Sequence, residues 1–429
     1  MELLVSLNGI IVADLTKDKN GGLHFSYKND WVERQGARPI SLSLPLSNEK
    51  YSGDRVYNFF DNLLPDNPGI RSRIQSRFKV NTAHAFDLLA AIGRDCVGAI
   101  QLSTQLPKNV KTIEYKKLTE QDIANILGGY KDSPLGMLAS DDDFRISIAG
   151  AQEKTALLKI GNEWVKPMGA TPTSHLLKLP IGVVPYTDID LKDSCENEFI
   201  CLALARAFGF DVANAEVLTF GEQKTLSVER FDRQYSADKS WIMRLPQEDF
   251  CQAMGVSSAK KYQSDGGPDI NACMNLLLSS SNRADRETFF KSQILFWLLA
   301  AIDGHAKNFS LFLNAGNRYQ MTPLYDILSA YPMLADKGLQ RQKIKMAMSL
   351  KGKNMHWNWD TIKARHFIST AEYIKYDPKI VKASIEFMFD NINIAINEVE
   401  SLIPDNFPSE IAEAIFNGMR DKQKTNKLI

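Results

Sequence analysis

The chain has 429 residues, long enough for two or three domains with sizeable apolar cores. With 44% hydrophobic and 24% charged residues, its composition is that of an ordinary globular protein. Basic and acidic residues both number 51, so the net charge is zero, which argues against a protein that coats nucleic acid by bulk charge but not against local basic patches.

The cysteines and the first residues indicate the compartment. Five cysteines at irregular spacing form no CxxC pair, as expected of reduced cytosolic thiols. The start, "MELLVSLNGIIVADL", has no basic region before its apolar stretch, which argues against a signal peptide. The longest apolar run, 294–302, is too short to cross a membrane. We therefore expect a cytoplasmic protein without a membrane partner.

The first part of the chain predicts a mixed module. Apolar and polar residues alternate in "LLVSLNGIIVADL", "GLHFSYKND" and "PISLSLPL", with Asn-Gly and Gly-Gly at the breaks. This pattern predicts a meander of short strands joined by tight turns over the first ~45 residues. The spacing becomes helical between 57 and 99, as in "NFFDNLLPD" and "HAFDLLAAIG". Residues 104–144 are more polar and predict a loop over a site or a linker.

Short strands return between 145 and 232, with one helix among them. They are "RISIAG", "KTALLKI", "EWVKPM", "SHLLKL", "AEVLTFG" and "KTLSVERF". The helix opens with a capping-box spacing from Asp193 to Glu196, and we expect it to end at Gly209. Its predicted apolar face is Ile200, Ala203, Leu204, Ala207 and Phe208.

After about 245 the pattern is mainly helical, interrupted by the hairpin "FSLFLNAGNRYQMTP". The order is thus an N-terminal module, a sheet lobe with one helix, and a helical lobe. We place the boundaries at 1–108, 109–245 and 246–429. A sheet lobe joined to a helical lobe suggests a nucleotide held between them.

A cluster of polar residues in an apolar setting is the first candidate site. "AIDGHAKNFSLF" places Asp303 five residues before Asn308, and a predicted hairpin leads on to Asp326. A protein-kinase catalytic loop has this spacing between its base, its metal-binding asparagine and a second metal-binding aspartate. Asp303 would accept the proton of a hydroxyl, and the other two would offer hard oxygen ligands to Mg²⁺. The alternative is that both aspartates only cap local structure.

Upstream features follow kinase order. Lys178 alternates with apolar neighbours on a predicted strand, from which a lysine reaches α- and β-phosphates; a solvent-facing lysine is the alternative. Glu196 or Glu198 on the next helix is a candidate to pair with it. "VERF", 228–231, ends the sheet lobe, where a hinge would contact adenine. The loop 147–155, "SIAGAQEKT", is neither a Walker A loop nor a kinase glycine loop, but its small residues let backbone N–H groups approach phosphates. A plain turn is the alternative.

Several longer motifs closely resemble one family. They are "ISIAGAQEKTALL", "VERFDR", "RLPQEDFCQ", "YQSDGGP", "DGHAKNFS", "TPLYDILSA", "FFDNLLPDNPGIRSRI" and "FDLLAAIGRDCVGAIQL". The chain is similar over nearly its whole length to the HipA family, the serine/threonine-kinase toxins of HipBA toxin–antitoxin modules. The resemblance implies an α+β, atypical protein-kinase-like bilobal fold with an additional mixed β/α N-terminal domain.

The resemblance also implies ATP and Mg²⁺ as cofactors and assigns roles to single residues. Asp303 would be the catalytic base, Asn308 and Asp326 the metal ligands, and Ser147 the site of an inactivating autophosphorylation. A phosphate on Ser147 cannot share a small anion-binding turn with the ATP phosphates, so the loop would be expelled. The implied ATP-binding residues are Ala149, Gly150, Ala151, Gln152, Glu153, Lys154, Lys178, Glu229, Arg230, Phe231, His305, Ala306, Lys307, Asn308, Tyr325 and Asp326.

The implied partners are a protein substrate and an antitoxin. The resemblance implies phosphorylation of glutamyl-tRNA synthetase, leading to dormancy, and repression of the operon with a HipB-like helix-turn-helix antitoxin dimer on operator DNA. One departure from kinases in general is His305, which stands where a lysine is usual; Lys307 is a possible substitute. Two basic patches, "GIRSRIQSRFK" and "KGLQRQKIK", are candidates for direct DNA contact or simply solvated faces.

Two other functions stay open. A small-molecule kinase would use the same catalytic parts, because these do not specify an acceptor. A catalytically silent corepressor subunit would need only the antitoxin. The filled base and metal-ligand positions argue against the silent subunit.

Overall fold

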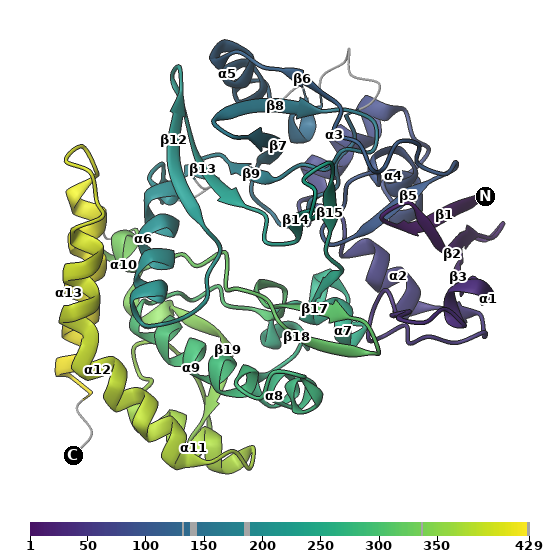
Figure 1. Ribbon diagram of the computed structural model, residues 1–429. Coiled ribbons are helices and arrows are strands. Elements are labelled where there is room, and N and C mark those ends of the chain that lie inside the picture. Colours follow the sequence, from purple (N-terminus) through teal and green to yellow (C-terminus); the bar gives the residue numbers. More distant parts are fainter. Residues whose placement is uncertain (131–132, 138–143, 184–188, 336–337, 427–429) are drawn as a thin grey trace. The chain divides into compact units, whose positions relative to one another are not determined.

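In the computed structural model, residues 1–130, 133–137, 144–183, 189–335 and 338–426 are described (Figure 1). The chain forms two compact units, each assembled from three segments. Unit 1 comprises Met1–Leu179, Leu218–Ala259 and Ser310–Gln320, and unit 2 comprises Pro180–Val217, Lys260–Phe309 and Met321–Ile429. Each unit is described by itself below.

Unit 1 begins with a five-stranded antiparallel sheet in the order β4-β3-β2-β1-β5. The predicted Asn-Gly turn joins its first two strands: Asn8 and Gly9 both have positive φ, 49° and 82°, which suits a tight hairpin. The strands are β1 (Glu2–Leu7), β2 (Ile10–Lys17), β3 (Leu23–Tyr27), β4 (Tyr51–Ser52) and β5 (Ile100–Ser103).

Short helices cover this sheet and complete its core. Phe59 and Phe60 of α2 and Leu89 of α4 are fully buried in one cluster with the inward strand residues. The strand predicted for "PISLSLPL" is wrong, because only an isolated bridge between Ser41 and Leu44 forms there; the flanking prolines cannot donate to a ladder. The helices are α1 (Asn29–Val32), α2 (Asp54–Asp61), α3 (Pro68–Phe78) and α4 (Ala85–Ile92).

A second sheet has six strands in the order β12-β13-β9-β7-β8-β6. Helix α5 (Glu120–Gly128) lies on one face, where Ile123 and Leu127 join the core of Leu157 and Leu177. Strand β6 and this helix correct the prediction of a loop over 104–144; Thr119 opens the helix with a full capping box. The strands are β6 (Tyr115–Lys117), β7 (Lys154–Ile160), β8 (Glu163–Pro167), β9 (His175–Lys178), β12 (Ala215–Phe220) and β13 (Gln223–Glu229).

Smaller elements complete unit 1. The predicted strand "RISIAG" is wrong, since residues 144–149 carry no strand. The predicted hairpin after the catalytic loop is confirmed as β17 and β18, which extend β16 into a three-stranded sheet. These elements are η1 (Pro134–Gly136), β14 (Arg233–Tyr235), β15 (Ile242–Arg244), β16 (Gln247–Asp249), α7 (Phe250–Met254), η2 (Ser258–Lys260), β17 (Ser310–Asn314) and β18 (Arg318–Met321).

Unit 2 is mainly helical around the buried Trp297 and Trp359. The predicted start and Gly209 stop of α6 are confirmed, but the capping box is wrong, because Asp193 makes no side-chain cap bond. The β19–β20 hairpin was not predicted. The helices are α6 (Ser194–Ala207), α8 (Ile270–Leu276), α9 (Asp285–Leu298), α10 (Tyr331–Ala335), α11 (Ala364–Tyr373), α12 (Pro378–Glu400) and α13 (Ser409–Lys424).

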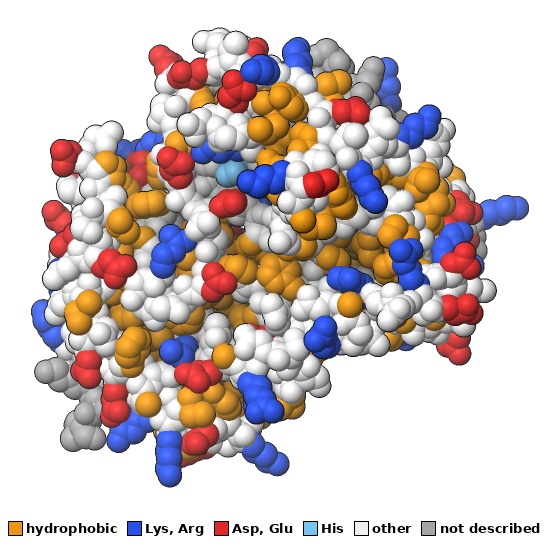
Figure 2. All heavy atoms as spheres, in the orientation of Figure 1, with side chains coloured by type: hydrophobic (Ala, Val, Ile, Leu, Met, Phe, Trp, Pro, Cys, Tyr) orange, Lys and Arg blue, Asp and Glu red, His pale blue; other side chains and the backbone are white. Residues whose placement is uncertain are grey.

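The remaining elements of unit 2 are short. They are β10 (Gly182–Val183), β11 (Asp190–Leu191), η3 (Gln263–Asp265), η4 (Leu277–Ser279), η5 (Ala306–Asn308), η6 (Arg341–Lys343), β19 (Lys345–Lys351) and β20 (Met355–Asn358). Among the described residues, no helix is long and apolar enough to span a membrane. Basic and acidic side chains are interspersed over the visible face, in keeping with the zero net charge (Figure 2).

A buried cluster of two carboxylates and three guanidinium groups ties the N-terminal module of unit 1 to its second sheet. Asp95 accepts hydrogen bonds from Arg233 (3.0 Å) and Arg244 (2.9 Å), and Arg230 lies 3.4 Å away. Asp232 accepts from Arg230 at 3.0 and 2.9 Å. Burial alone would raise the pKa of Asp95, but the three arginines hold it well below its usual range.

We predict that Asp95→Ala strongly destabilises the protein. It would leave three buried guanidinium groups with one carboxylate, and breaking such a set costs about 3–5 kcal/mol. Because the pKa of Asp95 is lowered in the folded state, its contribution is present above the pKa of an unfolded aspartate, about 3.9, and is lost as the pH falls below that value. Urea unfolding at pH 7 and pH 3 measures both effects. An unchanged midpoint at pH 7 would contradict this role.

Glu248 of β16 is a second buried carboxyl group, and its surroundings favour the neutral form. Its side chain is fully buried, and Oε1 accepts a bond from the Leu42 N–H at 2.8 Å. Burial raises the pKa of Glu248 to about 8. An unfolded glutamate ionises near pH 4.3, so unfolding releases a proton between these two values.

We therefore predict that Glu248 lowers the free energy of unfolding as the pH rises from about 5 to 8, by about 1.4 kcal/mol per pH unit. Glu248→Gln keeps the shape of the side chain and removes the titration. The difference in unfolding free energy between variant and wild type should grow in favour of the variant over this range. A difference that stays constant with pH would show that the folded-state pKa of Glu248 is not raised.

Candidate nucleotide and catalytic site

The predicted catalytic loop lies in unit 2, directly after the buried helix α9. Phe309, at its end, packs against Phe289 and Phe296 of that helix, with ring centroids 4.9 and 5.8 Å apart. Gly304 is required there, because an added Cβ would lie 2.3 Å from the Phe296 ring. Apolar packing on both sides thus fixes a loop whose Asp303 is exposed.

Asn308 joins the two predicted aspartates. Its Nδ2 donates to the backbone carbonyl of Asp303 at 3.1 Å and to that of Asp326 at 3.2 Å. Both amide hydrogens are used in this way, which directs Oδ1 away from these carbonyls. The three predicted site residues, which span 303–326 of the sequence, therefore lie together. The buried amide of Asn308 satisfies the backbone carbonyls of both aspartates, which holds this polar cluster in its apolar setting.

The backbone at Asp326 is unusual. Its φ is +59°, in the left-handed region that non-glycine residues rarely adopt outside turns and functional sites. The hydroxyl of Tyr325 donates to the carbonyl of Lys307 at 2.9 Å, which adds a second link between the two segments. Lys307, His305 and Ala306 are buried, so the predicted site residues of unit 2 form one local cluster.

Tyr262 belongs to this cluster but received no role from the sequence. Its hydroxyl donates to Oδ1 of Asp303, and its ring meets His305 edge-on with centroids 4.8 Å apart. The backbone N–H of His305 also bonds the carbonyl of Asp303, at 2.8 Å. Tyr262 is the first residue of the motif "YQSDGGP", which was counted among the family motifs without any of its residues being given a role. This motif was the signal from which Tyr262 could have been predicted.

The donor set of this cluster fits magnesium. Asn308 and Asp326 offer an amide and a carboxylate oxygen, and Mg²⁺ in phosphoryl-transfer sites typically takes one or two protein ligands beside phosphate and water. The described parts of the chain hold no group of three or more His, Cys, Asp and Glu side chains arranged for a metal.

The predicted phosphate-binding residues lie in unit 1. Lys154 on β7 and Lys178 on β9 are direct partners in the antiparallel ladder, and their exposed fractions are only 8% and 6%. The ladder thus places two cationic side chains at the point where the sequence predicts phosphate binding, and this role stays a prediction.

The loop before β7 is the candidate glycine cradle for a phosphate group. Gly150 has a φ of +105°, and an added Cβ would lie 2.5 Å from Nζ of Lys154. That ammonium group donates to the carbonyl of Ala149 at 2.9 Å, and the Gln152 amide bonds the carbonyl of Leu179. The positive φ favours glycine at position 150, because residues with a Cβ rarely adopt this conformation.

Ser147 is fully buried at the start of this loop. Its hydroxyl donates to the carbonyl of Leu63 at 2.8 Å, and its N–H donates to the carbonyl of Asp95 at 3.0 Å. A phosphorylated side chain needs room and solvation for about two negative charges. The segment must therefore leave this position before or during any modification of Ser147.

The predicted adenine-binding residues lie at the end of β13 and directly after it. Glu229 is exposed, and Phe231 is partly buried with its ring 5.8 Å from that of Phe312. The guanidinium of Arg230 lies in the buried ion cluster, so this side chain serves the fold. Glu196 and Glu198 are both buried on α6 of unit 2, and their pairing with Lys178 stays a prediction.

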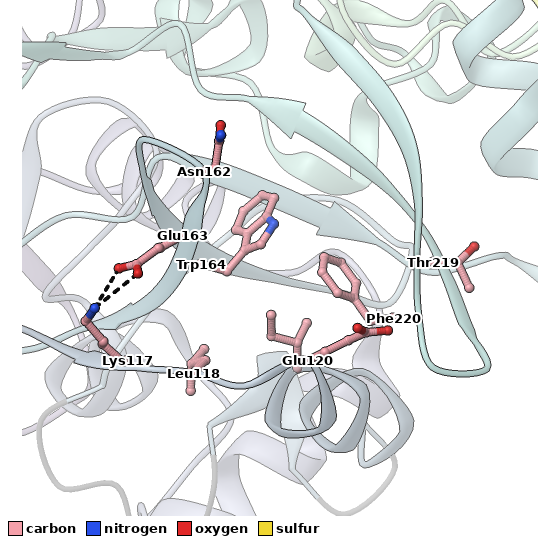
Figure 3. A pocket seen from close by; sticks show the side chains of 9 residues that line it. Lys117, Leu118, Glu120, Asn162, Glu163, Trp164, Thr219 and Phe220 are labelled. Atoms are coloured by element: carbon pink, nitrogen blue, oxygen red, sulfur yellow. Dashed lines mark hydrogen bonds and ion pairs between the residues drawn. The ribbon is translucent and has the colours of Figure 1, made fainter.

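A cavity of about 370 Å³ opens elsewhere on unit 1, near the start of α5 (Figure 3). Trp164 and Phe220 form its aromatic walls, at 86° to each other, and a Lys117–Glu163 ion pair of 3.0 Å lies on its rim. None of the predicted site residues lines it.

The predicted basic patches are only partly available to a partner. Arg71 pairs with Asp61 at 2.6 Å, and Arg73 pairs with Glu153, so both charges have partners within unit 1. Lys337 of the second patch lies outside the described residues. The other members are Arg77, Lys79, Arg341, Lys343 and Lys345.

Comparison with known proteins assigns the family. The family model of the HipA-like C-terminal domain matches residues 146–396, and that of the HipA N-terminal domain matches residues 3–103. The chain belongs to the HipA family. The Putative kinase Y4mE of Sinorhizobium fredii is 36% identical over 346 residues, which cover 78% of this chain and 79% of the relative.

A second relative and a solved structure agree with this assignment. The serine/threonine-protein kinase toxin HipA of Shewanella oneidensis is 30% identical over 343 residues, 77% of this chain and 75% of the relative. The chain is also similar to a solved structure titled as the HipA, HipB and operator DNA complex of that organism. The TM-score is 0.82 at 23% identity, covering 99% of this chain and 97% of that one. The predicted α+β kinase-like fold with an N-terminal domain is confirmed.

We predict that Tyr262→Phe lowers kcat for phosphoryl transfer about threefold to tenfold with little change in KM. The variant loses one hydrogen bond to a charged group, and the exposure of Asp303 to water limits the loss. Steady-state kinetics with varied ATP measures both parameters. Tyr373→Phe, at an exposed tyrosine of α11, is the matched control. Equal kcat in the two variants would exclude Tyr262 from positioning the loop.

Proposed function

We propose that this HipA-family protein is an ATP- and Mg²⁺-dependent serine/threonine protein kinase that acts as a growth-arresting toxin. The observation that carries this proposal is the convergence of Asp303, Asn308 and Asp326 through one buried amide. The buried lysine pair and the glycine cradle of unit 1 support a triphosphate as the second ligand.

In this proposal Asp303 accepts the proton of the substrate's hydroxyl group, and the oxygen of that hydroxyl attacks the γ-phosphorus. The bond from the γ-phosphorus to its bridging oxygen breaks, and the released diphosphate leaves as ADP. Mg²⁺ held by Asn308 and Asp326 neutralises phosphate charge when it is bound. Lys178 and Lys154 are the proposed phosphate-binding residues, and Glu229 and Phe231 the proposed adenine-binding residues. His305 and Lys307 are proposed to line the nucleotide site, whereas the Arg230 side chain is held in the buried ion cluster.

The regulation follows from Ser147. Its burial and its bond to Leu63 mean that a phosphate cannot be accommodated where the hydroxyl now lies. We therefore propose that autophosphorylation at Ser147 removes the loop from its triphosphate-binding position and inactivates the enzyme.

The proposed macromolecular partners are inferred from the similarity of this chain to HipA-family relatives. The relative from Shewanella oneidensis is described as a serine/threonine-protein kinase toxin, and its structure includes HipB and operator DNA. We propose a HipB-like helix-turn-helix antitoxin dimer as the partner here, operator DNA mainly through that antitoxin, and glutamyl-tRNA synthetase as substrate.

The test is Asp303→Asn. We expect phosphoryl transfer from ATP to fall by at least about a hundredfold and growth arrest to disappear, because the amide cannot accept the hydroxyl proton. Incubation with ATP and Mg²⁺ followed by mass spectrometry locates phosphate on Ser147 and on added glutamyl-tRNA synthetase. Asp390→Asn, at an exposed carboxylate of α12, is the control. Growth arrest that survives Asp303→Asn would overturn the kinase account of toxicity.

A further inference from the structure

One segment of the N-terminal module, residues 61–73, contacts the phosphate loop of unit 1 at several points. Pro65 forms a parallel bridge with Gly150, and the N–H of Asp66 donates to the Gly150 carbonyl at 3.0 Å. Further along the same segment, Arg73 forms an ion pair with Glu153. The motif "DNLLPDNPGIRSR" thus contacts the 149–154 loop, which binds the triphosphate in the proposed function.

The holding segment is itself rigid. Arg71 pairs with Asp61 at 2.6 Å, and its Nε donates to the carbonyl of Pro65, also at 2.6 Å. Asn67 caps α3 by accepting a bond from Gly69. These bonds hold the first turn of α3 in place. Arg73 lies two residues beyond Arg71 on this helix, so its backbone position is held as well.

The charge of Glu153 makes this contact important for an anionic ligand. Glu153 directly precedes Lys154, at the position where a phosphate loop normally has a small neutral residue. Its carboxylate, 22% exposed, would repel a triphosphate in the same loop. Arg73 pairs with this carboxylate and offsets its charge. The N-terminal module therefore supplies a charge that the loop itself lacks.

We propose that Arg73 is a positioning residue for nucleotide binding: from the N-terminal module it neutralises Glu153 and holds the phosphate loop in its binding conformation. This inference rests on the proposed function, since it takes the 149–154 loop as the triphosphate site. It assigns to the N-terminal module a direct part in the affinity for ATP.

A double-mutant cycle tests the proposal. The probe is a fluorescent ATP analogue with Mg²⁺, titrated against the full chain at low ionic strength, and KM and kcat are measured beside it. Arg73→Ala should raise the dissociation constant about tenfold and KM for ATP similarly, with little change in kcat. In the Glu153→Gln background, Arg73→Ala should change the dissociation constant by less than about twofold. Arg73→Lys should retain most of the wild-type affinity.

Controls separate this role from a general loss of stability. Lys28→Ala removes a comparable, partly exposed ion pair with Asp14 within the same module and should leave nucleotide affinity unchanged. Thermal unfolding of every variant identifies any that is not folded; if Arg73→Ala is unfolded, Arg73→Gln replaces it. The loss should also shrink at high ionic strength, because salt screens a partly exposed charge.

The outcomes are distinguishable. If the wild type does not bind the analogue, the proposed function fails. If the wild type binds and Arg73→Ala binds equally well, the positioning role fails alone. If Arg73→Ala weakens binding equally in the wild-type background and in the Glu153→Gln background, Arg73 acts through the fold and not through Glu153, which also overturns the proposal.

Discussion

The arrangement of unit 1 depends on the buried ion cluster around Asp95. One carboxylate from the N-terminal module meets three guanidinium groups, from the residue after β13, from β14 and from β15, with Asp232 as the second carboxylate. Such groups are tolerated in a core only when nearly all their hydrogen-bonding positions are used, which demands a single geometry. The backbone carbonyl of Asp95 also holds Ser147. The same residue thus fixes the sheet and the start of the phosphate loop.

The predicted phosphate-binding residues of unit 1 belong to a group of four charged side chains. Lys154 and Lys178 face each other nearly buried, Glu153 lies beside them, and Arg73 compensates Glu153 from another module. The predicted catalytic cluster of unit 2 is held by hydrogen bonds: Asn308 donates to the backbone carbonyls of Asp303 and Asp326, and the Tyr262 hydroxyl donates to the Asp303 carboxylate.

Part of this could be predicted from the chain. The alternating strands, the Asn8–Gly9 hairpin, the Gly209 helix stop and the hairpin after Asn308 depend on local periodicity and turn chemistry, so the predictions for them are confirmed. The strands expected at "PISLSLPL" and "RISIAG" fail although their pattern alternates. These segments make their hydrogen bonds to other parts of the fold, as Ser147 does with Leu63 and Asp95, and no local pattern records such partners.

The sequence by itself determined the family, the spacing of Asp303, Asn308 and Asp326, and the residue types that phosphoryl transfer requires, because these are properties of neighbours along the chain. Only the tertiary structure decided which of those side chains face one another. It placed Arg230 in the core, brought Tyr262 to Asp303 and set Arg73 against Glu153. Contacts between residues 40 to 150 positions apart depend on how whole elements pack, and packing leaves no periodic trace in the sequence.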